Sequence, residues 1–327
     1  MCPSRGGRSF TGGAQPHQRW CSTTPVALPD DGAHPHHRWS PQKPIFSQLS
    51  QDESKRAWRS LRMDFAEIGR WQDEGLNTVA VSSGSILDGV DAVTEPYQVS
   101  HHIGYLLHTA VDHLHTLTMV MGQAGAQHTF APYTLIRAAI ESASTALWIL
   151  QAESPHEVAR RSLQLEYADL NDLKRANQSV DPAAGHDEVR LEVFAHCLSR
   201  HGWKDPEIKP RPPGPLKIIQ ETSKHFDVFG AAVMWQMCSA AAHGRRWARE
   251  YLTLFEAQDD GRSKVLSGRL VSDESAIAMA LHIACCIVRK AKTVQGAFSK
   301  NPLHSGTSFS RPAPELQIVR PGLYLPR

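Results

Sequence analysis

A twenty-residue stretch, Ala131 to Leu150, constrains the fold more than any other part of the chain. It reads APYTLIRAAIESASTALWIL, with Pro132 where the first turn of a helix tolerates proline, followed mostly by helix-forming residues. At about 100° per residue, its apolar side chains form a broad stripe. The opposite side carries Ser144 and Trp148, where a surface helix would place lysines or glutamates. We therefore expect a central helix that is covered on both sides.

Arg137 and Glu141 are the only charged residues of this helix. They stand four residues apart, the spacing at which two helical side chains meet. In a central helix the pair would be at least partly buried, and each charge would then need the other as compensation. One interpretation is an ion pair that fixes the helix register. The other is the electrostatic wall of a pocket.

A second stretch without charges, residues 228–242, reads VFGAAVMWQMCSAAA and is rich in small residues. Small side chains let a neighbouring helix approach closely, so we expect this segment to be the partner of the central helix. Ser239 and His243 follow one face at a step of four, and Gly244 stands where a helix would end. We predict that Arg137, Glu141, Ser239 and His243 meet in one polar cluster between the two helices.

The remaining apolar periodicity predicts an all-α fold, a helical bundle. A loop with a short helix is expected at residues 75–96, and a small hairpin or loop at 261–271. The other helices are expected at residues 51–71, 99–121, 155–178, 187–201, 216–226 and 273–298.

Both ends of the chain differ from this pattern. Residues 1–44 are rich in proline and glycine without an apolar period, and residues 299–327 are rich in proline. Such composition cannot bury enough surface to order a segment, so we expect disordered N- and C-terminal tails. Residues 45–298 are then expected to form a single helical-bundle domain.

A histidine-rich stripe follows the expected helix at residues 99–121. His108, Asp112 and His115 are spaced so that they share the face opposite the apolar stripe. Their types and spacing could ligate a transition metal, although a second helix would have to bring a further ligand. The alternative is a solvated or interface face, which needs no metal.

Composition narrows the class of protein further. A net charge of only +2 over 327 residues gives no molecule-wide field for nucleic acid or an anionic membrane. The six cysteines form no CxxC pair and fit a reducing cytoplasm, and no run of about 18 apolar residues could span a bilayer. We expect a soluble cytoplasmic protein that has no membrane partner. The chain contains no phosphate loop, dinucleotide fingerprint or nucleophile elbow, so no cofactor is expected.

The stretches YTLIRAAIESASTALWIL and MWQMCSAAAHG resemble an uncharacterised family of bacterial helical proteins, in which an Arg-xxx-Glu helix precedes a Ser-xxx-His-Gly helix end. The resemblance covers about residues 99–297 and implies an all-helical bundle. That family is distantly similar to the HEPN superfamily of toxins and defence proteins, whose ribonucleases pair an arginine with a histidine four to six residues away. Arg190 and His196 have that spacing here, but Leu191 replaces the Asn or Asp that often follows the arginine.

Two functional hypotheses follow. The first is a non-catalytic helical module that binds a protein partner or another copy of itself, in the stress or defence setting that the resemblance implies. The second is an enzyme that cleaves RNA or another phosphate ester between the two central helices. In that enzyme His243 would be the general acid or base and Arg137 would hold the phosphate, with RNA as the partner.

Overall fold

The computed structural model describes residues 50–74, 79–180, 188–258 and 267–301. The expected tail at residues 1–44, and residues 302–327 of the expected C-terminal tail, lie outside the described residues. Within them the fold is all-α apart from one hairpin, which confirms the predicted class.

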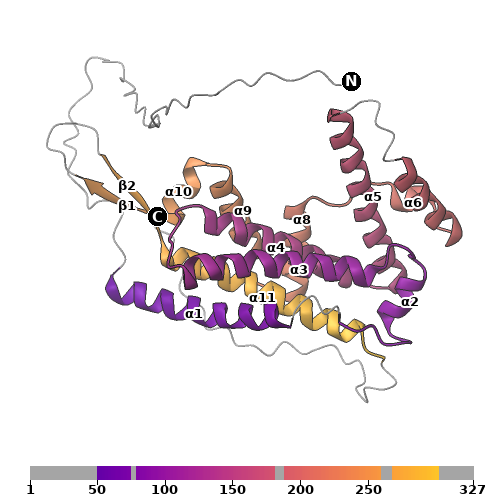
Figure 1. The fold of residues 1–327 in the computed structure, drawn as a ribbon, viewed down its shortest axis with the longest axis horizontal. Helices are drawn as coiled ribbons and strands as arrows, with labels where there is room; N and C mark the ends of the chain where they lie inside the picture. Colours follow the sequence, from indigo (N-terminus) through magenta and orange to yellow (C-terminus); the bar gives the residue numbers. More distant parts are fainter. Residues whose placement is uncertain (1–49, 75–78, 181–187, 259–266, 302–327) are drawn as a thin grey trace, which may run out of the picture. The chain divides into compact units, whose positions relative to one another are not determined.

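Helix α4 (Ala131–Leu150) begins and ends at the predicted residues, with Pro132 in its first turn. It packs against α3 (Val99–Leu117), α8 (Pro215–Phe226), α9 (Ala231–Ala242) and α11 (Glu274–Phe298), the first of which lies beside it in Figure 1. Both of its faces are covered, as expected, because Ser144 and Trp148 are buried as well as the apolar stripe. The indole Nε1 of Trp148 donates to Glu221 Oε2 at 3.1 Å, so burial leaves that polar atom satisfied.

Helix α1 (Gln51–Asp73) begins with a capping box, in which Ser50 and Glu53 satisfy each other's backbone N–H groups. Its apolar face packs on α11 and α3, and the short α2 (Ile86–Ala92) lies within the segment expected to be a loop with a short helix. Helix α3 ends at Leu117 and continues as a π-helical segment, η1 (Thr118–Gln123), so the predicted end at residue 121 falls within this segment.

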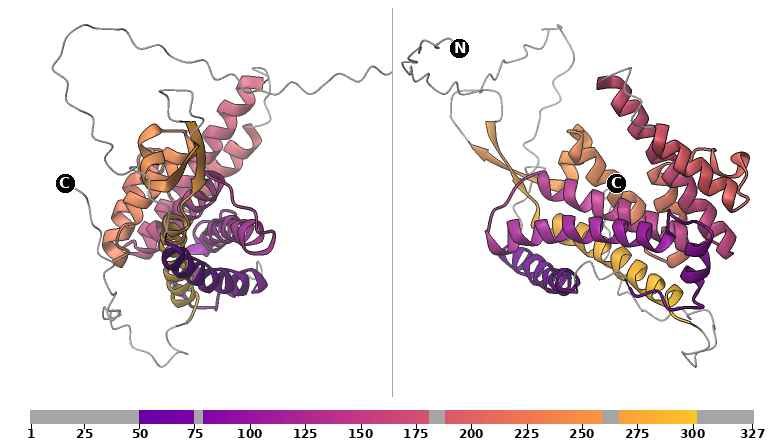
Figure 2. Two further views of the ribbon diagram at one scale, coloured as in Figure 1. Left: turned by 90° about the vertical axis from the view of Figure 1, so that its left-hand side faces the viewer. Right: turned by 45° about the vertical axis from the view of Figure 1, so that its right-hand side comes forward.

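Helices α5 (Pro155–Val180) and α6 (Glu188–Arg200) match the predicted segments to within two residues. Two short helices were not predicted: α7 (Asp205–Ile208) and α10 (Arg246–Leu252). The hairpin pairs β1 (Thr253–Gln258) with β2 (Ser267–Ser272) in antiparallel register, Thr253 opposite Ser272. Its first strand therefore begins well before the predicted segment. Figure 2 shows the hairpin leading into α11.

Among the described residues, no helix combines the length and the apolarity that crossing a membrane requires.

Candidate functional site

The Arg137–Glu141 pair forms as its spacing predicts. Arg137 Nη2 lies 3.3 Å from Glu141 Oε2, and the two side chains are 29% and 32% exposed. The pair lies beside a depression of about 330 Å³ that Leu106 of α3 and Ser142 and Thr145 of α4 also line. The two charges are therefore neither fully buried nor fully solvated.

The partner that α9 offers this pair is Trp235. Its indole Nε1 donates to Glu141 Oε2 at 3.1 Å, and the guanidinium carbon of Arg137 lies 5.5 Å from the centre of its rings. The carboxylate thus accepts a hydrogen bond from α9 and forms an ion pair within α4, and the cation lies against an aromatic face. The sequence did not lead us to predict a role for Trp235. An indole N–H in a charge-free helix does, however, need a hydrogen-bond acceptor from elsewhere once it is buried.

Cys238 lies one turn further along α9 and is buried. Burial raises the pKa of its thiol to about 12, and the charge of Arg137 offsets only part of that effect. Arg137 Nε is also buried and has no hydrogen-bond partner among the described residues. This side of the site therefore holds a neutral thiol and an arginine with spare hydrogen-bonding capacity.

Among the described residues, no hydrogen bond connects Ser239 or His243 to the Arg137–Glu141 pair. Ser239 is partly buried, and His243 is exposed at the C-cap of α9. There Gly244 N–H donates to Ala241 and Arg245 N–H to Ala240, with Gly244 at a φ of +65°. This is a Schellman ending, so helix termination explains the glycine of the Ser-xxx-His-Gly pattern. The expected four-residue cluster is reduced to Arg137 and Glu141, with Trp235 as their partner from α9.

The histidine stripe of α3 faces outward. Asp112 is exposed, while His108 and His115 are partly exposed. Within the described ranges, no group of three or more His, Cys, Asp or Glu side chains is placed to hold a metal ion. Arg190 and His196 are both exposed on α6, and no contact joins them within those ranges.

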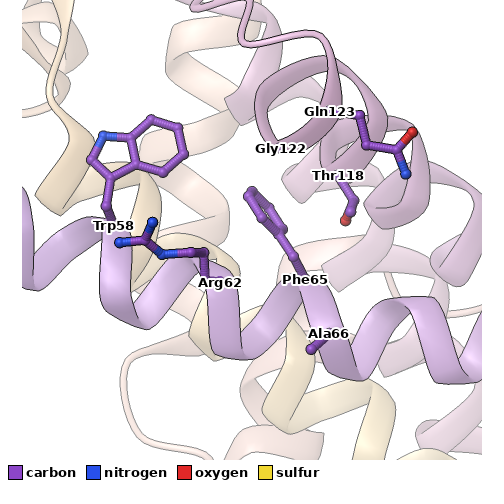
Figure 3. A pocket seen from close by; sticks show the side chains of 7 residues that line it. All are labelled: Trp58, Arg62, Phe65, Ala66, Thr118, Gly122 and Gln123. Atoms are coloured by element: carbon purple, nitrogen blue, oxygen red, sulfur yellow. The ribbon is translucent and has the colours of Figure 1, made fainter.

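A second depression, of about 360 Å³, lies between α1 and η1 (Figure 3). Trp58, Arg62 and Phe65 line it from α1, and Phe65 points toward Gly122. A Cβ atom on Gly122 would lie 3.1 Å from the Phe65 ring, so glycine permits this close packing. The depression is a shallow groove with one cation.

The surface of α10 holds a group that the sequence reading overlooked. Trp247 and Tyr251 are 47% and 59% exposed. Arg245 and Arg246 are exposed beside them and Arg249 is partly exposed, while Glu250 is the one acidic residue from His243 to Leu252. None of the three arginines forms an ion pair with a described residue. We call Arg245, Arg246, Trp247, Arg249 and Tyr251 the α10 surface.

Comparison of the chain with protein-family models, curated proteins and solved structures gives no match.

Proposed function

We propose that this protein is a non-catalytic helical binding module whose ligand is single-stranded RNA, held by the α10 surface. The observation that carries the proposal is that, between residues 245 and 251, arginines that form no ion pair with a described residue alternate with exposed aromatic rings. Guanidinium groups bind phosphates, and aromatic rings stack on unpaired bases of any sequence. Both groups are already exposed, so binding would need no rearrangement of the core.

The bundle beneath supports this surface. Ala248 and Leu252 of α10 are buried, and α10 packs against α9 and α11. The helix is therefore held by its apolar side, which leaves its arginines and rings directed to solvent. The proposal includes a cytoplasmic location, consistent with the free cysteines of the described residues, and a stress or defence role, which the family resemblance implies.

Fluorescence anisotropy with a labelled twelve-nucleotide RNA tests the proposal on the full chain. Trp247→Ala should weaken binding about tenfold, since stacking contributes about 1 to 3 kcal/mol per base. Replacing Arg245, Arg246 and Arg249 by glutamine should lower the slope of log K against log salt by about two, because roughly 0.7 counterions are released per phosphate.

The matched control removes the same charge from α1, where Arg56, Arg59 and Arg62 are exposed. Their replacement by glutamine should leave most of the affinity in place. Equal losses in both triple variants would show unspecific attraction and contradict a site on α10. A dimer that dissociates on Trp247→Ala, without RNA binding, would identify a second copy of the chain as the occupant instead.

A second candidate function, cleavage of RNA or another phosphate ester, has one observation in its favour. His243 is exposed two residues before Arg245, so a general acid or base would stand beside a phosphate-binding group. This cleavage is measured by following the length of the same RNA over time. Cleavage by the wild type that His243→Ala abolishes would establish this activity, and uncut RNA would leave binding as the function.

A further inference from the structure

Three side chains form a connected series across the contact between α1 and α11: Asp64, His282 and Cys286. Nδ1 of His282 lies 3.3 Å from Asp64 Oδ1, and its Nε2 lies 3.7 Å from the Sγ of Cys286. The spacing of four residues places the histidine and the cysteine on one face of α11, and α1 packs against this helix. A carboxylate that orients an imidazole beside a thiol is the arrangement that activates cysteine nucleophiles.

Asp64 supplies the negative charge behind the imidazole. It is only 4% exposed, and its Oδ2 is buried without a hydrogen-bond partner among the described residues. A buried carboxylate is costly unless a cation compensates it, and His282 is the cation it contacts. The hydrogen bond to Asp64, followed by that to Cys286, raises the pKa of His282 to about 10 against the opposing effect of burial.

Arg289 adds a second cation beside the sulfur. Its Nη1 lies 3.6 Å from Cys286 Sγ, while its Nε donates to Glu67 Oε1 at 2.8 Å and its Nη2 contacts Glu67 Oε2. The two-point contact with Glu67 fixes the guanidinium in place. Burial raises the pKa of the Cys286 thiol, but the hydrogen bonds and charges of His282 and then Arg289 outweigh burial and lower it.

Cys286 differs from the other described cysteines in its exposure to solvent. Cys197, Cys238 and Cys285 are buried, whereas Cys286 is partly exposed. Burial also raises the pKa of the neighbouring Cys285 well above its ordinary value. Of the four free cysteines in the described ranges, only Cys286 combines a partly exposed side chain with neighbouring cations, as reactive cysteines do.

A purely structural role, an ion pair that holds α1 against α11, would account for Arg289 and Glu67 alone. It would not require an imidazole between a buried carboxylate and a thiol. The residues that line the two depressions include none of the cluster. A reagent the size of hydrogen peroxide needs no pocket to reach the partly exposed thiol of Cys286.

We propose that Cys286 is a site of reversible oxidation by hydrogen peroxide. The thiolate sulfur attacks one peroxide oxygen, so that an S–O bond forms as the O–O bond breaks. The leaving hydroxide takes the Nε2 proton of His282 and departs as water. Sulfur loses two electrons and the peroxide gains them, which gives a sulfenic acid that a small thiol can reduce.

The test treats the reduced full-length protein with hydrogen peroxide in the presence of dimedone, which traps sulfenic acids, and locates the adduct by mass spectrometry. We expect the adduct on Cys286, with no adduct on Cys197, Cys238 or Cys285. Cys286→Ser should abolish it, and the matched neighbour Cys285→Ser should retain it. An adduct on Cys285, or none in the wild type, would overturn the proposal.

The role of the histidine is tested separately. His282→Gln should slow trapping at pH 7 by about threefold or more, because a smaller thiolate fraction is only partly offset by a more nucleophilic sulfur. An unchanged rate in a folded variant would contradict it. If the variant does not fold, the test is the pH dependence of the alkylation rate of Cys286 in the wild type. An apparent pKa at or above that of an ordinary cysteine thiol would overturn the proposal. RNA binding by Cys286→Ser should be unchanged, so the two proposals fail independently.

Discussion

The contact between α4 and α9 and the contact between α1 and α11 contain the same residue types with opposite outcomes. In the first, Arg137 and Glu141 belong to one helix and pair with each other, while Cys238 is buried nearby. In the second, Arg289 of α11 reaches across to Glu67 of α1, and Cys286 lies beside it at the surface. Each contact thus combines an arginine, a glutamate and a cysteine.

The difference shows that an arginine near a thiol does not by itself make the thiol acidic. At Cys238 burial outweighs Arg137, and the pKa rises to about 12. At Cys286 a second cation, His282, adds to the first, and the pKa falls. His282 is held there by the carboxylate of Asp64 from the opposite helix, whereas Glu141 in the α4–α9 contact pairs with Arg137 and Trp235 and, among the described residues, brings no second cation to Cys238. The lowered pKa of the Cys286 thiol therefore depends on a polar group, Asp64, that the opposite helix contributes.

The largest expected effect is a difference in reactivity between the two thiols. In the native protein iodoacetamide should modify Cys286 at least about a hundredfold faster than Cys238 at pH 7, because Cys238 is both buried and neutral. Peptide mass spectrometry over a time course measures both rates in one sample. Comparable rates would remove the contrast between the two contacts.

The next effect concerns the α4–α9 pair. Glu141→Ala should lower the free energy of unfolding by about 1 to 2 kcal/mol, because it leaves the Trp235 indole without its acceptor and Arg137 without its ion-pair partner. The partial exposure of the pair keeps this loss below that of a fully buried ion pair. Urea unfolding of Glu141→Ala, Arg137→Met and the double variant measures it. Strictly additive losses would show that the two residues are not coupled.

The sequence predicts the local parts of this picture. Pro132 and the apolar repeat define α4, and Gly244 marks the end of α9, because helix starts and ends are encoded by neighbouring residues. The i, i+4 pair of Arg137 and Glu141 is predictable for the same reason. Trp235 is not, since its choice of Glu141 over solvent depends on how α9 packs on α4.

The α1–α11 cluster of Asp64, His282 and Cys286 is harder to predict from the sequence. His282 and Cys286 stand four apart in a predicted helix, which is a visible signal, but histidine and cysteine often share a helix face without consequence. Asp64 is 218 residues away in a helix rich in charges, and only the packing of α1 on α11 distinguishes it. Tertiary contacts of this range cannot be derived from periodicity.

A smaller effect should appear in alkaline solution. The folded pKa of His282, about 10, exceeds its unfolded value of about 6.5. Its contribution is therefore fully present below pH 6.5 and is lost as the pH rises toward 10. We expect about 1 kcal/mol, discounted because the side chain is 57% exposed.

Urea unfolding between pH 6 and 10 measures this loss. A Cys286→Ser background removes the opposite contribution of the thiol, and with it the smaller part of the His282 pKa shift that Cys286 supplies, so that the part due to Asp64 is measured. Adding His282→Gln there should flatten the profile, and an unchanged slope would assign the effect to another group.

The smallest effect is expected for the α3 stripe, because His108, Asp112 and His115 form no hydrogen bond or ion pair with another side chain among the described residues. Replacing His108 and His115 by glutamine should change the free energy of unfolding by no more than about 0.5 kcal/mol, as at ordinary surface positions. Thermal unfolding with and without added zinc measures it. A zinc-dependent rise in melting temperature that the double variant loses would revive the metal hypothesis.

The most direct measurement is the titration of His282 by long-range ¹H–¹⁵N NMR on protein labelled at histidine. His102 provides an opposite case in the same spectrum, because burial lowers its pKa to about 4 while its Nδ1 lies 2.9 Å from Ser162 Oγ. If Asp64 and Cys286 hold the imidazolium as described, His282 stays protonated until about pH 10 while His102 is already neutral at pH 6. A His282 midpoint near 6.5 would contradict the account.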